Sequence, residues 1–232
     1  MEQMTMKKPS IEEYWRDLAQ PWEDASYEGD TSKLTFIERI ATYGRQHIHR
    51  RKETAIEIIK PFVKGKVILD IGCAGGIFEI ELLRNGAVDV SGVDVSADAV
   101  RTASDRAKSL HLDQQAHFYN CTIDQFDKYV KGKVDILTGL GILEYLRPEL
   151  IRDLVNHVKP KGILFSFDEK EYTLKKGVHY VYRVAKQMPY YKKFRADEIA
   201  QLLAGCDYSP VQFKREHANS FVYYLPAELA NR

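Results

Sequence analysis

Three glycines between an apolar run and an amphipathic segment are the first residues whose spacing suggests chemistry. Gly72, Gly75 and Gly76 separate KVILDI from IFEIELLRNG. Glycine lets the chain turn sharply and lets ligand atoms approach the backbone. The helix start that follows offers unpaired N–H groups to an anionic or carbonyl group. The pattern indicates a ligand-binding turn after a strand, with a purely structural turn as the alternative.

A carboxylate follows at a distance that is typical of nucleoside sites. Asp94 ends the segment VSGVD, 18 residues beyond Gly76. In doubly wound sheets, an acidic residue about 20 residues after the glycine turn accepts hydrogen bonds from ribose hydroxyls, and such charge-assisted bonds are strong. The alternative is that Asp94 or Ser96 caps the next helix. The spacing favours the ribose role.

The residues around the turn restrict the kind of nucleoside. No Lys-Ser or Lys-Thr follows the glycines, which excludes a P-loop, and the order of glycines is not the G-x-G-x-x-G of nicotinamide sites. Asp70 lies just ahead of the turn, where its charge would repel a pyrophosphate and attract an ammonium group. S-adenosylmethionine carries an ammonium and a sulfonium, so these residues favour a methyl donor.

The elements that must position these residues alternate along the chain. Short apolar runs predict strands at 66–71, 88–95, 116–120, 134–140, 162–167, 208–216 and 219–226. Amphipathic segments predict helices at 77–86, 97–110, 123–130, 148–159 and 195–206. Helical periodicity also covers much of the first 60 residues or so and stops at Pro61.

This alternation predicts an α/β fold, a doubly wound and mostly parallel seven-stranded sheet with helices on both faces. The last two strands are joined by a short turn and must pair antiparallel, because a parallel crossover needs about a dozen residues. We expect a helical N-terminal extension, acting as a lid, at residues 1–62. The remaining residues, 63–232, form the main domain, with an insertion at 170–195.

Composition excludes several classes of protein. The chain has 232 residues, 44% of them hydrophobic, which is enough for one buried core. No apolar run approaches the ~18 residues of a membrane span, and the N-terminus lacks a signal-peptide core, so we expect a cytoplasmic protein without membrane contact. The three cysteines lack metal-ligand or disulfide spacing. With 34 basic and 33 acidic residues, general attraction to nucleic acid is disfavoured.

Four motifs in order resemble those of the class I S-adenosylmethionine-dependent methyltransferases, which have a Rossmann-like fold. VILDIGCAGG is similar to their D-x-G-x-G-x-G signature, and GVDVSADAV resembles their second motif. VDILTGLGILEYL resembles the fourth-strand segment, and HVKPKGILFSF resembles the turn and fifth strand. The resemblance covers roughly 43–225. It implies a methyltransferase that uses S-adenosyl-L-methionine as cofactor, without a metal.

The resemblance also implies which residues bind the cofactor. They are Asp70, Gly72, Cys73, Ala74, Gly76, Asp94, Val95, Thr122, Ile123, Leu140 and Gly141. The loop would hold the methionine part, Asp94 the ribose and Val95 the adenine. Two positions depart from the family pattern. Ala74 replaces the middle glycine, and Cys121 stands where many members have an aspartate for the adenine amino group.

The acceptor side is expected in the insertion at 170–195. This segment holds six lysines, two arginines and five tyrosines against one acid. Such a segment could bind a small anionic or aromatic acceptor, or RNA, or could be a solvated amphipathic helix. We favour the small acceptor because the rest of the chain is not basic. A second basic run, at 45–52, could contact a phosphate or carboxylate beside the cofactor, or be a solvated helix face.

Transfer to an oxygen, the acceptor atom we favour, usually needs a base with a pKa near neutrality. His179 in the insertion and Glu144 after the fourth predicted strand are the candidates for this catalytic role. An RNA- or protein-directed methyltransferase and a catalytically silent cofactor-binding partner domain are the competing hypotheses. The oligomeric state, a homodimer included, is left open.

Overall fold

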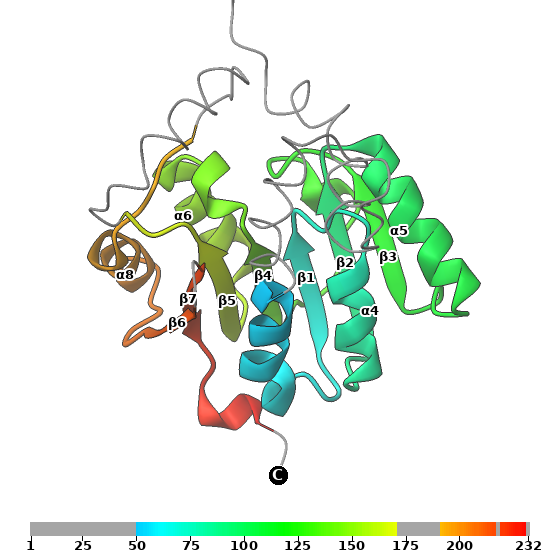
Figure 1. Ribbon diagram of the computed structural model, residues 1–232, viewed down its shortest axis with the longest axis horizontal. Coiled ribbons are helices and arrows are strands. Elements are labelled where there is room, and N and C mark those ends of the chain that lie inside the picture. Colours follow the sequence, from blue (N-terminus) through cyan, green and yellow to red (C-terminus); the bar gives the residue numbers. More distant parts are fainter. Residues whose placement is uncertain (1–49, 171–190, 217–218, 231–232) are drawn as a thin grey trace, which may run out of the picture.

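A single mixed sheet forms the centre of the computed structural model, which describes residues 50–170, 191–216 and 219–230. Its strands are β1 Val67–Ile71, β2 Asp89–Asp94, β3 Ala116–Asn120, β4 Ile136–Leu140, β5 Gly162–Phe167, β6 Gln212–Glu216 and β7 Asn219–Tyr224. The seven strands lie in the order β3-β2-β1-β4-β5-β7-β6 (Figure 1). The first five are parallel, and β7 is antiparallel to both β5 and β6. The predicted fold class is confirmed.

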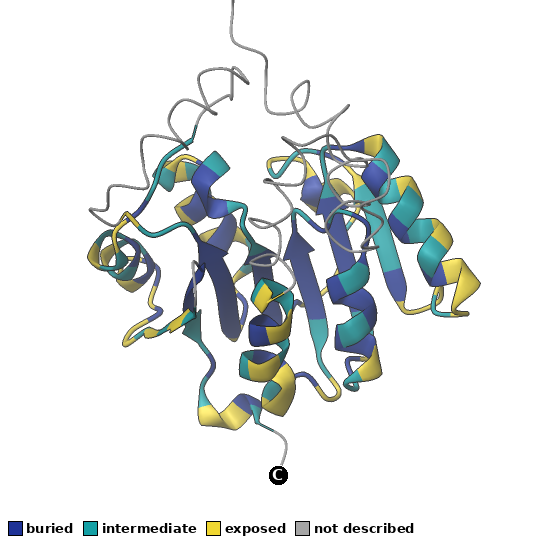
Figure 2. Ribbon diagram, viewed as in Figure 1, coloured by how far each residue is buried: buried dark blue, intermediate teal, exposed yellow. Residues whose placement is uncertain are grey.

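Helices cover both faces of this sheet. They are helical residues 50–59, α4 Ile77–Arg84, α5 Ala97–Ser109, α6 Pro148–Val158 and α8 Ala196–Ala204. Residues 50–59, α4 and α5 contribute Ile59, Phe78 and Ala107 to the core on one face. On the other face, α6 and α8 contribute Leu154 and Ile199. Figure 2 shows the buried strands between these two partly exposed layers.

Local sequence explains why these elements form. All six residues of β5, GILFSF, are buried, as expected for a central strand that is covered on both faces. Along α5, Ala99, Ala103 and Ala107 recur every four residues and are buried against the sheet. Ser96 caps α5 by accepting the Ala99 N–H at 3.3 Å. A continuous apolar run and a helical period of buried alanines therefore lead to the expected strand and helix.

One predicted helix is wrong. Residues 123–130 form only the short 3-10 helix η2, Phe126–Lys128. Phe126 is buried, but no side chain caps the start of this turn, and Gly132 follows with a φ of 93°. A segment this short gains few backbone hydrogen bonds for the cost of nucleating a helix, so a single anchoring aromatic residue leaves it as a turn.

The order of the strands places the functional edge. The chain runs outward from β1 to β2 and β3 in one direction, and to β4 and β5 in the other. Ligands of such sheets bind at the carboxyl ends of the strands where this order reverses. The carboxyl ends of β1 and β4, at the upper edge in Figure 1, are therefore the expected site.

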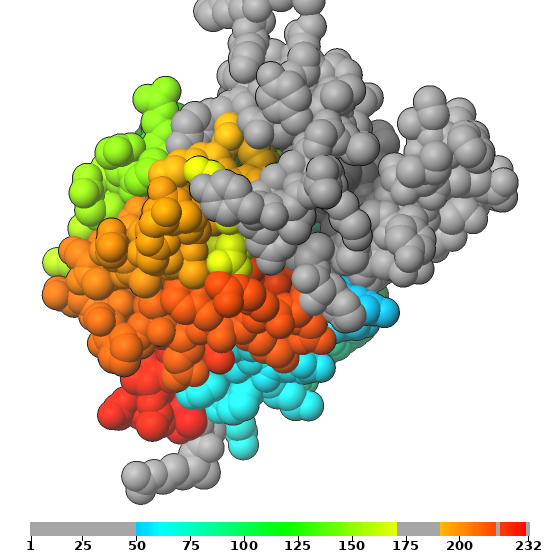
Figure 3. Space-filling model, turned by 60° about the vertical axis from the view of Figure 1, so that its left-hand side comes forward, coloured from blue at the N-terminus to red at the C-terminus, as the bar shows by residue number. Residues whose placement is uncertain are grey.

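The antiparallel strands β7 and β6 form the end of the sheet beyond β5. Figure 3 shows β6 and β7 beside helical residues 50–59. Lys214 on β6 lies 3.1 Å from Glu57 on that helix, which joins the two ends of the described chain. No helix among the described residues is long and apolar enough to cross a membrane. The cysteines Cys73, Cys121 and Cys206 are buried and free of disulfides. Residues 1–49 of the predicted N-terminal extension at 1–62, and His179, lie outside the described residues.

Candidate functional site

The glycine turn after β1 adopts a backbone shape that side chains disfavour. Gly72, Ala74 and Gly76 have φ angles of 79°, 45° and 77°, all in the left-handed region. The N–H groups of Gly72 and Cys73 both donate to the Val93 carbonyl, at 2.8 and 3.2 Å. These bonds hold the turn against the end of β2. Ala74 keeps the conformation of the glycine that it replaces, at the cost of local strain.

Gly76 is required for a second reason. A Cβ atom added to it would lie 2.8 Å from both the Ala103 side chain and the Phe118 ring. The turn therefore packs directly on α5 and β3. Close packing of this kind fixes where the first N–H groups of α4 point, at the edge where a ligand of the sheet is expected.

Asp94 anchors the turn to the end of β2. Its Oδ2 accepts the Ala74 N–H at 3.1 Å, and its Oδ1 accepts the Ser96 N–H at 2.9 Å. Burial raises the pKa of Asp94, although these backbone N–H groups oppose the rise. Ser96 rather than Asp94 caps α5. A carboxylate offers about four acceptor sites, more than these backbone N–H groups use, so acceptor capacity remains for a hydroxyl donor of a ligand.

Asp70 lies behind the turn. It is only 2% exposed, and its Oδ1 accepts the Thr138 hydroxyl of β4 at 2.5 Å. Burial raises the pKa of Asp70 to about 6, against the effect of hydrogen bonds with Glu79 and Thr138. The Asp70 carboxyl faces β4 and α4, so its contact with an ammonium group stays a prediction.

The segment after β3 adds a polar group to the same edge. The Cys121 N–H and the Asn120 side chain both donate to the Asp94 carbonyl, at 3.1 and 3.0 Å. Next to them, the buried hydroxyl oxygen of Thr122 has no hydrogen-bond partner within the part of the chain that the structure describes. A buried hydroxyl without a partner costs free energy, so this position suits a polar ligand atom. Val95 and Ile123 are half-buried beside it.

Glu144 follows β4, on the short 3-10 helix η3, Leu143–Tyr145. Its side chain is 2% exposed. The Asp168 N–H donates to Oε1 of Glu144, whereas Oε2 has no hydrogen-bond partner among the described residues. Burial raises the pKa of Glu144 to about 7, with Arg51 lowering it and Asp168 raising it. A carboxyl with this pKa can accept a proton near neutrality.

Arg51, from helical residues 50–59, reaches the end of β4. Its Nε donates to Oδ1 of Asn219 on β7 at 2.8 Å. A Cβ atom added to Gly141 would lie 1.8 Å from an Arg51 guanidinium nitrogen, so the guanidinium lies against this glycine. Its charge also lowers the pKa values of Glu144 and Asp168. The basic run at 45–52 left open a phosphate or carboxylate contact and a solvated helix face; the structure places Arg51 of this run at the end of β4, and a contact with an anionic ligand stays a prediction.

Asp168 follows β5 and joins the edge to the residues after the insertion. Its Oδ2 accepts the Tyr191 hydroxyl at 2.6 Å and lies 3.2 Å from the Lys193 ammonium nitrogen. Burial would raise the pKa of Asp168, but Lys193, Tyr191 and Arg51 outweigh it and hold the pKa below its usual value. The Tyr145 and Tyr191 rings pack edge to face with centroids 5.3 Å apart. Both Tyr191 and Lys193 lie in the basic, tyrosine-rich insertion at 170–195, but its composition did not indicate that these two side chains would meet Asp168.

The structure therefore brings most of the predicted residues to one edge. The predicted cofactor residues come from the ends of β1, β2, β3 and β4, and Glu144 follows β4. His117 lies near the opposite, amino end of β3, where its Nε2 is 3.2 Å from Asp89. It lies within β3, away from the carboxyl edge of the sheet. The catalytic candidate His179 is outside the described residues and stays a prediction.

Comparisons with known proteins show what the chain is similar to. A family model described as a methyltransferase domain matches residues 68–162. The chain is 36% identical over 107 residues to a ubiquinone biosynthesis O-methyltransferase of Glaesserella parasuis, covering 44% of each chain. It is 26% identical over 196 residues to that of Psychrobacter cryohalolentis, covering 74% of each. The chain thus spans less than half of the first relative's length and about three quarters of the second's.

A solved structure shows the same fold. The crystal structure of magnesium protoporphyrin IX methyltransferase from Synechocystis with bound SAH superposes with a TM-score of 0.68 at 18% identity. The match covers 92% of this chain and 96% of the other. At this sequence identity the similarity shows the fold alone.

Proposed function

We propose that the chain is a class I S-adenosylmethionine-dependent methyltransferase that transfers a methyl group to an oxygen atom of a small anionic or aromatic acceptor. The names of its relatives support an oxygen acceptor and a small molecule. The observation that carries the proposal is the buried Oε2 of Glu144, which has no hydrogen-bond partner among residues 50–170, 191–216 and 219–230, at the strand edge that holds the glycine turn and Asp94.

The residues of the edge fit the cofactor. Asp94 keeps acceptor sites for ribose hydroxyls, and the Thr122 hydroxyl suits a polar group of the adenine. Arg51 lies against Gly141, where its guanidinium suits a carboxylate of the methionine part. When bound, S-adenosylmethionine supplies a methyl group that its sulfonium already activates. The protein's task is then to hold the acceptor oxygen in line and to remove its proton.

Glu144 is suited to removing this proton. The Asp168 N–H holds Oε1 in place, so Oε2 is the atom that can accept the proton from the acceptor hydroxyl. With a pKa of about 7, Glu144 is largely ionised above neutrality and still basic enough to bind a proton. Aligned general bases contribute about 10²- to 10⁴-fold to rates. His179 is the second candidate for this role.

Binding of S-adenosylhomocysteine tests the cofactor assignment. The unfolding temperature of the full chain should rise with this ligand, because a ligand that binds only the native state stabilises it. NAD⁺ at the same concentration should have no effect. No rise at saturating S-adenosylhomocysteine would refute the cofactor site.

Transfer from tritiated S-adenosylmethionine separates the competing functions. Small phenols and hydroxy acids are the expected acceptors, with bulk RNA and unfolded protein as the alternative substrates. Label in RNA or protein alone would favour the competing hypothesis, and binding without any transfer would favour a silent cofactor-binding domain. Cytoplasmic location and a homodimer remain predictions.

A further inference from the structure

We infer that Lys193 binds an anionic group of the acceptor beside the hydroxyl that Glu144 deprotonates. The inference rests on the proposed function, and it selects the anionic acceptors from the two classes named above. It also assigns different roles to Lys192 and Lys193, which are adjacent and which the sequence alone does not distinguish.

The backbone after the insertion returns to the edge of the sheet at Glu144. The Lys192 N–H donates to the Glu144 carbonyl at 2.8 Å, and the Lys170 N–H donates to the Phe194 carbonyl at 2.8 Å. Phe194 is 1% exposed and packs in the core with α8. These contacts fix residues 191–194 against the loops that follow β4 and β5.

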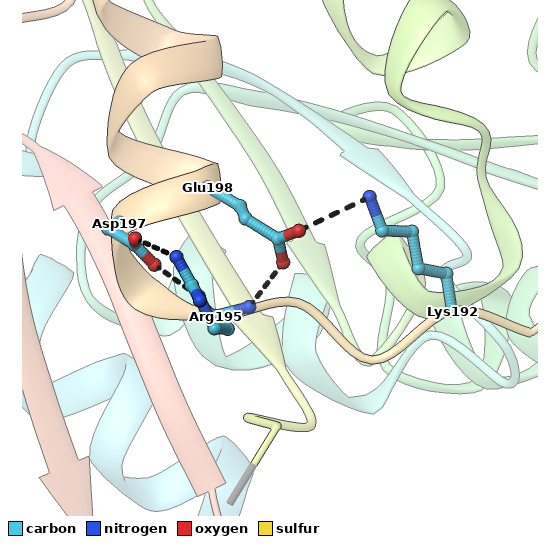
Figure 4. Close-up of polar contacts among 4 residues, drawn as sticks. All are labelled: Lys192, Arg195, Asp197 and Glu198. Atoms are coloured by element: carbon cyan, nitrogen blue, oxygen red, sulfur yellow. Dashed lines mark hydrogen bonds and ion pairs between the residues drawn. The ribbon is translucent and has the colours of Figure 1, made fainter.

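Side chains alternate along this fixed segment. Tyr191 and Lys193 both reach Asp168 beside the base, at 2.6 and 3.2 Å. Lys192 points elsewhere, with its ammonium 4.6 Å from the centroid of the Phe194 ring and 3.8 Å from Glu198. Figure 4 shows Lys192 directed to Glu198 at the start of α8. The two lysines are therefore adjacent in sequence, but their side chains contact different residues.

Lys193 keeps the capacity to bind a ligand. Its side chain is 27% exposed, and Asp168 takes one of its three N–H donors within the described residues. Because Asp168 also donates its backbone N–H to Glu144, one residue holds both the base and the cation. The ammonium is thus held in place beforehand, so it loses little freedom on meeting an anion.

The charges of the cluster fit an anionic acceptor. Arg51 and Lys193 are cations, Asp168 is an anion, and Glu144 is the group that gains a proton. These four side chains alone have no net charge while Glu144 is ionised and one positive charge once Glu144 holds the proton. The carboxylate that is proposed to meet Arg51 would come with the ammonium and the sulfonium of the same cofactor, so the cofactor would add one further positive charge. The acceptor oxygen offsets the proton on Glu144 only while it is an oxyanion. Once the oxygen has taken the methyl group it is neutral, and an anionic group on the acceptor then still compensates this proton, whereas a neutral acceptor leaves it uncompensated in a partly buried site.

The test compares acids with their amides. The probes are 2-, 3- and 4-hydroxybenzoate and the three matching hydroxybenzamides, which differ in charge but hardly in shape. The isomers vary the separation between hydroxyl and carboxylate. Binding to the full chain saturated with S-adenosylhomocysteine is measured by calorimetry. At least one acid should bind the wild type about tenfold or more tightly than its amide.

Matched variants assign this preference to one lysine. Lys193→Met keeps the aliphatic stem and removes the charge, so the preference should fall to about onefold to threefold, and Lys193→Arg should retain part of it. Lys192→Met should keep the preference, because its side chain lies against Phe194 and Glu198. Affinity for S-adenosylhomocysteine should be equal in all variants, which also shows that they fold.

Two results would overturn the inference: no acid preferred over its amide by the wild type, or equal losses in Lys193→Met and Lys192→Met. Failure of the wild type to bind S-adenosylhomocysteine would instead contradict the proposed function. In that case the preference for an acid over its amide, measured on the protein without cofactor, still tests whether Lys193 binds an anion.

Discussion

Replacement of Glu144 by glutamine should lower activity and raise stability, and the structure gives the size of both effects. Glutamine keeps the Oε1 acceptor for the Asp168 N–H but cannot take a proton at the other position. If Glu144 is the base, kcat/KM should fall by about 10²- to 10⁴-fold. The rise of wild-type kcat/KM with pH, which should have its midpoint near the Glu144 pKa of about 7, should disappear in the variant.

The stability effect follows from the same pKa. Burial raises the pKa of Glu144 from 4.5 to about 7, so the folded protein binds this proton more tightly than the unfolded chain does. The associated stability is fully present below pH 4.5 and is lost as the pH rises through about 7. At about 1.4 kcal/mol for each pKa unit, the loss at pH 8 is on the order of 3 kcal/mol. Glu144→Gln removes this loss.

Urea denaturation of both proteins at pH 5 and pH 8 measures the effect. Relative to the wild type, Glu144→Gln should gain up to about 3 kcal/mol between these two pH values. Glu149→Gln, in the exposed first turn of α6, is the control: it should leave the rate and its pH profile unchanged and alter stability by less than about 1 kcal/mol. The reasoning is refuted if Glu144→Gln retains the wild-type rate and pH profile, or if the wild type gains stability relative to it as the pH rises.

Three further substitutions test the glycine turn. Asp94→Ala should lower the free energy of unfolding by about 2 kcal/mol, because the N–H groups of Ala74 and Ser96 lose their acceptor, and should weaken S-adenosylhomocysteine binding at least about tenfold by calorimetry. Unchanged affinity would contradict the ribose role. Gly76→Ala should cost more than about 2 kcal/mol in urea denaturation, since its φ is 77° and its Cβ would meet Phe118. Ala74→Gly should instead stabilise the fold by up to about 1 kcal/mol, and a loss of stability would show that its φ of 45° carries no strain.

Much of the fold was predictable because its signals are local. The predicted strands at 116–120 and 162–167 match β3 and β5, and α5 ends within one residue of its predicted end. Alternation of apolar runs and helical periodicity depends only on residues close in sequence. The segment at 123–130 was misassigned because its period suggested a helix that a single buried aromatic residue does not support.

The strand order was not predictable from these local signals. The sequence predicted that the last two strands pair with each other. It did not predict that β7 lies between β5 and β6. This placement puts Asn219 of β7 within 2.8 Å of Arg51, which is 168 positions away in the chain. Only the folded sheet brings these residues together.

The sequence by itself therefore determined the type of site: a glycine turn, Asp94 at the right spacing, and Glu144 after the fourth strand. The tertiary structure decided which of these groups lie together and what surrounds them. Burial and the fields of Arg51 and Asp168 move the pKa of Glu144 to about 7, and Asp168 selects Lys193 over Lys192. Such effects depend on desolvation and on charges from distant segments, which no local pattern of residues encodes.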